Sequence, residues 1–319
     1  MPLGSVPSFF EAVEDFFANL AAVGWGSLVL GLALFAAYLA LRSRAYFNVL
    51  RAAFPAEPFE WRRIWGAYMA AYGFNNFVPA RGGDVIKLFL TRSSIPRSSY
   101  PAVGSSFFVE GIFDLCIAIP VLAFAFSQGA FPKPPDFPDI GAADLSFFAA
   151  NPRFTLFLIT VLGIAAFAAF AVLSVRVKAF WARVRQGLTI LRDRRRYFRE
   201  VFLIQLAGWG LRFAAFWMFL DAFGVGGSVE NVLLVLGVNA VAALVPFTPG
   251  GAGVQQALLV KVFAGTAGGA TVAAYSVGQQ IAIALFSLAV GFAALALIFR
   301  FRSFRAVIDA GKASRAAES

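Results

Sequence analysis

The stretch VPFTPGGAGVQQALL, residues 245–259, decides the fold class. Apolar residues approach and leave a centre that is rich in proline and glycine. This pattern predicts a helix that enters a membrane, stops at 246–253 and resumes as a second half-helix. Backbone without helical hydrogen bonds is tolerated within a bilayer only where it is buried in protein or lines a wet cavity. The stretch is therefore a candidate substrate site.

A second stretch, NNFVPARGGDVIKLFL at residues 75–90, repeats this design. Two interrupted apolar segments in corresponding halves of a chain are the best sequence indication of a transporter's binding site. We therefore predict two re-entrant helical hairpins, at 64–90 and 231–263. The cations around the first hairpin indicate that it opens to the cytoplasm, whereas the second opens to the outside, so the two face one another from opposite leaflets.

The composition indicates a polytopic membrane protein. Of the 319 residues 60% are hydrophobic, against about 45 to 50% in a soluble domain. We predict an all-α, inverted-repeat-like bundle that forms one transmembrane domain over residues 1–319. The net charge of +10 comes from cations at the ends of apolar spans, so we expect no nucleic-acid partner. With no histidine and Cys116 alone, we expect no metal site and no cofactor.

The order of apolar spans and cations predicts a topology. The N-terminus lies outside and the tail, 300–319, lies in the cytoplasm of a prokaryote, beneath its inner membrane. The first half covers 24–126 and the second 154–299, and residues 45–63 lie on the cytoplasmic surface. The predicted crossing segments are 24–41, 100–126, 154–175, 201–220 and 270–299.

The segment 176–199 carries nine cations interleaved with apolar residues at helical spacing. We predict a basic amphipathic helix on the inner leaflet, where each cation near anionic lipid contributes about 1 kcal/mol. The simpler reading, which we favour, is an anchor that only sets the orientation of the chain.

Several ionisable residues fall within apolar segments, where a charge costs about 2.5 to 3.5 kcal/mol at mid-bilayer. Glu110 and Asp114 share one helix face at i and i+4, and we expect Arg212 to pair with them. One interpretation is a headgroup site, in which Arg81 or Arg212 meets a lipid phosphate and the carboxylates meet an amine or carry protons. The other is a set of structural ion pairs. The residues concerned are Arg81, Asp84, Lys87, Glu110, Asp114, Arg212 and Lys261.

The glycines of the second hairpin also admit two readings. Gly250, Gly251 and Gly253 can let a phosphate approach free N–H groups at a half-helix N-terminus. They can instead serve only a sharp turn with close packing.

The motifs PARGGDVIKLFL, VEGIFD and VPFTPGGAGVQQALL resemble the integral-membrane, flippase-like region of bacterial lysylphosphatidylglycerol synthases. The resemblance implies two facing hairpins with a lipid cavity between them, translocation of a polar-headed lipid, and a homodimer. The synthases' soluble aminoacyl-transferase domain has no counterpart here, so no aminoacyl-lipid synthesis is expected. The residues that match the family's pattern are Pro79, Arg81, Gly83, Asp84, Glu110, Asp114, Pro246, Pro249, Gly250, Gly251 and Gly253.

Two departures from that family affect the expected substrate. Gln255 and Gln256 stand where relatives commonly have glutamate, and the last span offers Tyr275, Gln279 and Gln280 in place of an arginine. We therefore predict an amide network, with Gln256 and Gln279 among the lipid-binding residues. The charge preference for substrate is left open.

Two other function classes stay open. Asp84, Glu110 and Asp114 could hold Mg²⁺ with a lipid phosphate in a lipid-modifying enzyme, although no dense acidic motif is present. A scaffold or regulator of envelope synthesis would need no polar path through the membrane. The sequence shows no nucleotide-binding loop, so the driving force for transport would be a gradient, a proton or downhill lipid flow.

Overall fold

The computed structural model describes residue 18 and the ranges 22–75, 82–127, 178–242, 253–265 and 267–301. Regular structure in these ranges is helical, so the all-α prediction is confirmed. The predicted crossing segment 154–175 lies outside the described residues, as do residues 76–81 and 243–252, which contain the prolines of the two predicted breaks.

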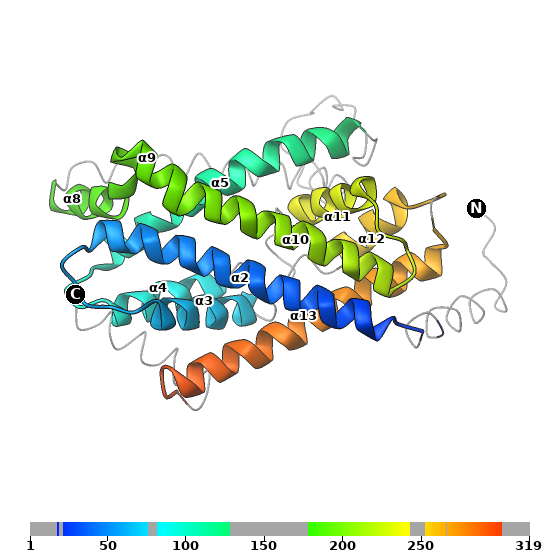
Figure 1. Ribbon diagram of the computed structural model, residues 1–319, viewed down its shortest axis with the longest axis horizontal. Helices are drawn as coiled ribbons and strands as arrows, with labels where there is room; N and C mark the ends of the chain where they lie inside the picture. The colour runs from blue at the N-terminus through cyan, green and yellow to red at the C-terminus, as the bar shows by residue number, and fades with distance from the viewer. Residues whose placement is uncertain are drawn as a thin grey trace, which may run out of the picture.

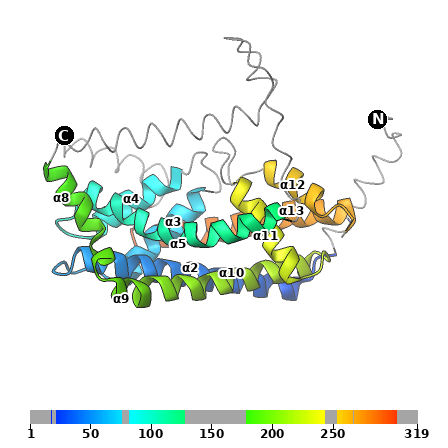
Figure 2. The same ribbon diagram turned by 90° about the horizontal axis from the view of Figure 1, so that it is seen from above.

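Long apolar helices run the length of the bundle (Figure 1). Within the described ranges, four helical segments are long and apolar enough to cross a membrane, which makes the chain a multi-pass membrane protein. These four long helices are α2 (Trp25–Ala53), α5 (Tyr100–Ser127), α10 (Leu203–Ala222, continuous with the turns from Arg194) and α13 (Gly269–Leu297). Helices α2 and α10 lie side by side along one face (Figure 2).

Two pairs of shorter helices occupy opposite ends of the bundle (Figure 1). Helix α3 (Trp61–Asn75) packs against α4 (Gly82–Ser94) at the end where α2 finishes. Helix α11 (Val229–Ala242) contacts α12 (Val254–Val262) at the other end. With 15, 13, 14 and 9 residues, these helices are shorter than the roughly 20 residues that span a bilayer.

Glycines allow α3 to approach α13 closely. A Cβ on Gly73 would lie 2.7 Å from the carbonyl oxygen of Ser287, and a Cβ on Gly291 would lie 2.9 Å from that of Met69. The contact is reciprocal, because each helix places a glycine against the backbone of the other. Small residues at such crossings are the usual means of close helix packing in membranes.

We expect Gly73→Val to lower the free energy of unfolding by about 1 to 3 kcal/mol, the usual cost of overpacking. The matched control is Gly210→Val, since a Cβ on Gly210 meets no atom within 4 Å. Thermal unfolding in detergent measures both variants. Equal stability of the two would contradict the close α3–α13 contact.

Helix α2 does not end near Arg42, and residues 45–53 are helical rather than a separate surface segment. Tyr46, Val49 and Leu50 in this part are fully buried. Its cations are accommodated by aromatic rings: the Cζ atom of Arg44 lies 5.1 Å from the Phe47 centroid and that of Arg51 lies 5.4 Å from the Phe59 centroid. Reading every arginine as the end of a span therefore made the predicted span too short.

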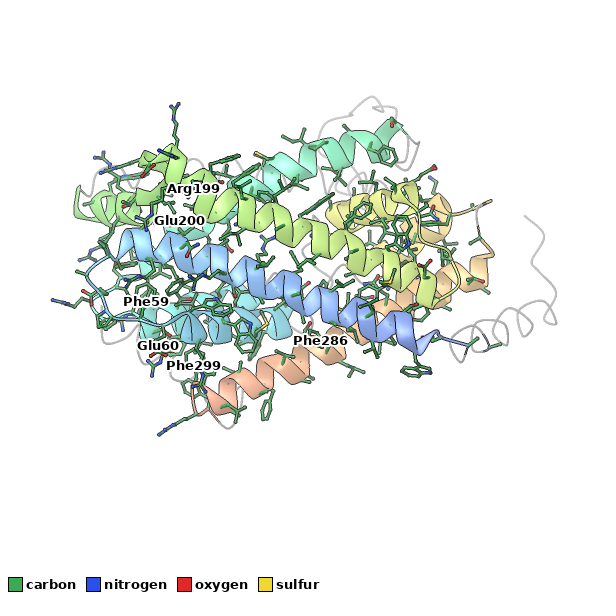
Figure 3. All side chains as sticks on the ribbon, viewed as in Figure 1. Phe59, Glu60, Arg199, Glu200, Phe286 and Phe299 are labelled. Carbon is green, nitrogen blue, oxygen red and sulfur yellow. The ribbon has the colours of Figure 1, made fainter. Side chains whose placement is uncertain are left out.

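The basic segment is not one amphipathic helix in the part that is described. It divides into α8 (Lys178–Gly187), a 3₁₀ turn, η2 (Thr189–Arg192), α9 (Arg194–Tyr197) and a π-helical turn, η3 (Phe198–Phe202). Asp193 starts α9 by accepting a hydrogen bond from the Arg196 N–H at 2.9 Å. Arg199 and Glu200 lie at the same end of the bundle as Glu60 and Phe299 (Figure 3).

Candidate functional site: a charged cluster among α2, α3, α4 and α5

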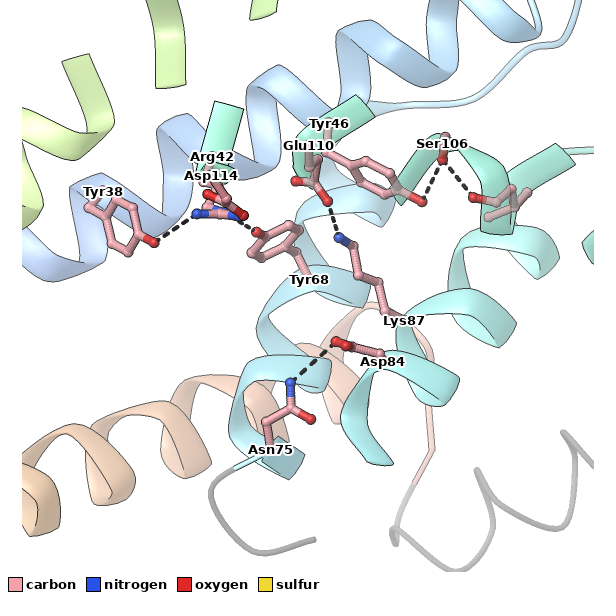
Figure 4. Close-up of polar contacts among 11 residues, drawn as sticks. Tyr38, Arg42, Tyr46, Tyr68, Asn75, Asp84, Lys87, Ser106, Glu110 and Asp114 are labelled. Atoms are coloured by element: carbon pink, nitrogen blue, oxygen red, sulfur yellow. Dashed lines mark hydrogen bonds and ion pairs between the residues drawn. The ribbon is translucent and has the colours of Figure 1, made fainter. Parts of the chain in front are cut away.

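Two ion pairs and several tyrosines meet where α2, α3, α4 and α5 come together (Figure 4). Arg42 and Tyr46 come from α2, Tyr68 comes from α3, and Lys87 comes from α4. Glu110 and Asp114 come from α5, one helical turn apart. Both carboxylates reach this charged cluster, which confirms that they share a helix face.

The first ion pair joins Lys87 to Glu110. The Lys87 Nζ donates to Glu110 Oε2 at 2.5 Å, and the two side chains are only 9% and 6% exposed. Aromatic rings surround the ammonium, with the centroids of Tyr46, Tyr68 and Phe107 at 4.0, 4.3 and 4.5 Å from Nζ. These distances fall within the range in which ring faces attract a cation.

The second ion pair joins Arg42 to Asp114. The guanidinium also donates from Nε to the Tyr68 hydroxyl at 2.7 Å and from an Nη to the Tyr38 hydroxyl at 3.2 Å. The Asp114 side chain is 47% exposed, whereas that of Arg42 is 18% exposed. Tyr68 contacts both pairs, since it accepts from Arg42 and presents its ring to Lys87.

Asn75 holds the end of α3 against the start of α4. Its Oδ1 accepts from the Gly83 N–H at 2.8 Å, and its Nδ2 donates to Asp84 Oδ1 at 3.3 Å. Gly83 is required at this contact, because a Cβ there would overlap the Ala71 carbonyl oxygen. Lys87 follows Gly83 by one helical turn, so this contact also positions the ammonium.

Arg212 does not form the ion pair that we predicted for it. The carboxylates of Glu110 and Asp114 are taken by Lys87 and Arg42 instead. The Arg212 Cζ lies 5.7 Å from the Tyr38 centroid and 5.6 Å from the Phe216 centroid, and its buried Nε has no hydrogen-bond partner among the described residues. The prediction failed because position within the sequence does not show which helices are neighbours.

Three predicted site residues of the second half, Gly253, Gln256 and Gln279, lie apart from this cluster, at α12 and α13. Gly253 adopts a φ of 85°, and its N–H donates to Gln256 Oε1 at 2.6 Å. Gln256 Nε2 in turn donates to Gln280 Oε1 at 2.5 Å, which confirms an amide contact between the two helices. Gln279 is 3% exposed, and in the part of the chain that the structure describes its Oε1 has no hydrogen-bond partner.

Arg81, Pro246, Pro249, Gly250 and Gly251 lie outside the described residues, so their role as site residues stays a prediction.

Sequence reasoning missed Arg42 and the aromatic residues around the cluster. Arg42 was counted with the cations that set orientation, although Tyr38, Arg42 and Tyr46 recur every four residues on one face of α2. That polar and aromatic periodicity inside an apolar helix was the available signal.

The charged cluster is suited to binding a polar group. In the part of the chain that is described, no three His, Cys, Asp or Glu side chains lie close enough to share a metal. Asp84, Glu110 and Asp114 instead contact Asn75, Lys87 and Arg42, respectively. Each pair presents both a donor and an acceptor, so the cluster can exchange its internal contacts for those of a zwitterionic or anionic group.

A family model described as "Lysylphosphatidylglycerol synthase TM region" matches residues 6–291. No curated protein and no solved structure matches the chain. The matched range includes the charged cluster, Arg212 and the glutamines of α12 and α13.

Proposed function

Because this chain belongs to the lysylphosphatidylglycerol synthase transmembrane family, we propose that it moves a polar-headed lipid across the cytoplasmic membrane of a prokaryote. In this proposal it acts as a flippase-like transporter rather than as an enzyme. The headgroup passes the charged cluster while the acyl chains stay in the surrounding bilayer.

The observation that carries this proposal is the presence of two ion pairs inside an apolar helical bundle. Charges within a membrane are costly and are usually retained for substrate or ion pathways. Buried ion pairs contribute little net stability, because desolvation offsets their attraction. The buried pair of Lys87 with Glu110 therefore favours a functional role over a purely structural one.

The opposed pairs of short helices support an alternating-access path. We propose that α3 with α4 and α11 with α12 form the re-entrant hairpins at 64–90 and 231–263. Their positions at opposite ends of the bundle (Figure 1) suit an arrangement in which each hairpin gates one leaflet. With the basic end in the cytoplasm, the N-terminus lies outside and the C-terminus inside.

Arg212 is the proposed contact for the lipid phosphate. It lies on a transmembrane helix without an ion pair to any described residue, and its guanidinium faces the Tyr38 ring beside Arg42. A phosphate can accept from both guanidinium groups. Across the chain the proposed lipid-binding residues are Arg81, Asp84, Lys87, Glu110, Asp114, Arg212, Pro246, Pro249, Gly250, Gly251, Gly253, Gln256 and Gln279.

A liposome assay with headgroup-labelled phospholipids tests this function. We expect wild type to translocate at least one lipid of a panel that varies in headgroup charge. Arg212→Gln should slow translocation by about 10- to 100-fold, since a hydrogen bond to a charged group is worth about 1.5 to 3 kcal/mol. The control is Arg62→Gln, because Arg62 is an exposed cation at the end of the bundle.

One combination of results would contradict the transport proposal. Failure of folded wild type to translocate any lipid of the panel, together with Mg²⁺-dependent chemical conversion of one of them, would replace transport by the lipid-modifying alternative.

A further inference from the structure

We propose that the turns leading into α10 bind the phosphate of an anionic phospholipid from the leaflet at the basic end of the bundle, and that this site loads the lipid toward the charged cluster. The loading role rests on the proposed function, whereas binding of the lipid does not. The turns form an open recess of about 550 Å³, a volume in the usual range of small-molecule sites. The residues that line this arginine recess are Asp193, Arg195, Arg196, Arg199 and Glu200.

Two of the three arginines in the recess are available to an anion. Glu200 Oε2 accepts from Arg196 Nε at 2.9 Å, and Asp193 accepts from the backbone N–H of Arg196. Both carboxylates of the recess are thus engaged by one residue. Arg195 and Arg199 are exposed and form no ion pair with any residue that the structure describes. Two guanidinium groups at one recess match the several acceptor oxygens of a phosphate.

The backbone holds these two guanidinium groups in a defined arrangement. Arg195 and Arg199 are four residues apart and therefore lie on the same side of the chain. The π-helical turn η3 follows, and a hydrogen bond at 2.7 Å from Asn48 Nδ2 to the Glu200 carbonyl oxygen ties it to α2. Turns of this kind are rare and are frequent at functional sites. The recess is therefore a built feature of the end of α10.

An exposed apolar strip begins beside the arginines, as a ligand with acyl chains requires. Phe198 is exposed, and its ring stacks on that of Phe202 with the centroids 5.3 Å apart. Leu203 and Leu206 on α10 are also exposed and continue the strip along the helix. A free phosphate would use only the cations, whereas a phospholipid uses the cations and the strip together. The occupant that fits both is a phospholipid.

The turns that form the recess also contact the helix that carries the carboxylates of the charged cluster. Tyr197 lies close enough to Asp114 for the two to interact electrostatically, and its buried hydroxyl has no hydrogen-bond partner among the described residues. Phe113 packs edge-on against Phe202, with ring centroids 5.2 Å apart. A headgroup that leaves the recess toward the bundle therefore meets the pair of Arg42 with Asp114, whose carboxylate is partly exposed.

The alternative is an anchor that only sets the orientation of the chain. Such an anchor depends on how many cations lie at this end and not on their exact positions. Arg183 and Arg185 on α8 provide the matched control, since they are exposed at the same end of the bundle (Figure 1) and do not line the recess.

Photo-cross-linking tests binding without any transport measurement. The probe is a photoactivatable phosphatidylglycerol, which carries one negative charge, added to the protein in detergent. We expect wild type to be labelled within residues 198–206, as located by mass spectrometry. Arg195→Gln with Arg199→Gln should raise the lipid concentration for half-maximal labelling by about 30-fold, since each cation near anionic lipid contributes about fivefold in affinity. Arg183→Gln with Arg185→Gln removes the same charge and should label nearly as wild type.

Three results would overturn the site. The first is equal labelling of the two double variants, each shown to be folded by circular dichroism. The second is labelling of wild type by photoactivatable phosphatidylcholine, which has no net charge, as strong as that by phosphatidylglycerol. The third is displacement of the probe by glycerol 3-phosphate at concentrations equal to those of the lipid, because the recess would then be a site for a soluble phosphate.

A second measurement tests loading. In liposomes with a low fraction of fluorescently labelled phosphatidylglycerol, Arg195→Gln with Arg199→Gln should translocate the lipid up to about 30-fold more slowly than the α8 control. The difference should vanish as the lipid fraction rises, since loss of a loading site raises KM and leaves kcat unchanged. Translocation equal to the control at every fraction would overturn loading while lipid binding stands. Absence of translocation by wild type would reject loading together with the proposed function, and the cross-linking result would still decide binding.

Discussion

Lys87→Met is expected to lower the free energy of unfolding by about 3 to 5 kcal/mol, the usual cost of removing one partner of a buried ion pair. The substitution keeps an apolar side chain among the rings of Tyr46, Tyr68 and Phe107, so little packing is lost. It leaves the Glu110 carboxylate buried at 6% exposure without its cation. The expected loss in the free energy of unfolding is therefore the cost of leaving the Glu110 charge uncompensated.

The double variant Lys87→Met with Glu110→Leu is the control for this prediction. Replacing both members of a buried pair by apolar residues is often neutral or stabilising, so the double variant should recover most of the lost stability. Equilibrium unfolding in mild detergent measures both variants. If Lys87→Met alone were as stable as wild type, the pair would not be buried as described.

Gly83→Val should have the second large effect, a loss of about 2 to 5 kcal/mol in the free energy of unfolding. A Cβ at this position would overlap the Ala71 carbonyl oxygen and would lie 2.6 Å from Asn75 Oδ1. Relief of these overlaps requires α3 and α4 to separate. Separation breaks the hydrogen bond from the Gly83 N–H to Asn75 and withdraws Lys87, one turn later, from Glu110.

Gly111→Val is the matched control for Gly83→Val. Gly111 lies within α5, and a Cβ there would meet no atom within 4 Å. We expect this variant to keep nearly the stability of wild type in the same thermal unfolding measurement. Two variants of equal stability would contradict the close contact between α3 and α4.

The helices could be predicted from the sequence because their signals are local. Apolar length and helix-breaking residues predicted α5 at 100–126, where the helix is Tyr100–Ser127, and α13 at 270–299, where it is Gly269–Leu297. The prediction for the basic segment was wrong for an equally local reason. The end of α8 at Gly187 and the cap at Asp193 were read as part of one amphipathic helix.

The partners within the site could not be predicted, since they depend on which helices are neighbours. The spacing of Glu110 and Asp114 correctly placed both carboxylates on one face. Their cations come from α4 and α2, whereas Arg212 on α10 turns to the rings of Tyr38 and Phe216. From the sequence alone, the role of an arginine near the end of a span cannot be distinguished from that of an arginine near its centre, because both roles depend on how the helices pack.

The central claim is that the buried charges serve translocation rather than hold the helices together, and the double variant Lys87→Met with Glu110→Leu tests it most directly. Its rate of translocation of a headgroup-labelled phospholipid is compared with that of wild type in liposomes of the same composition. We predict a folded protein of near wild-type stability that no longer translocates the lipid. A double variant that is folded and as active as wild type would contradict the account, because the Lys87–Glu110 pair would then be only structural.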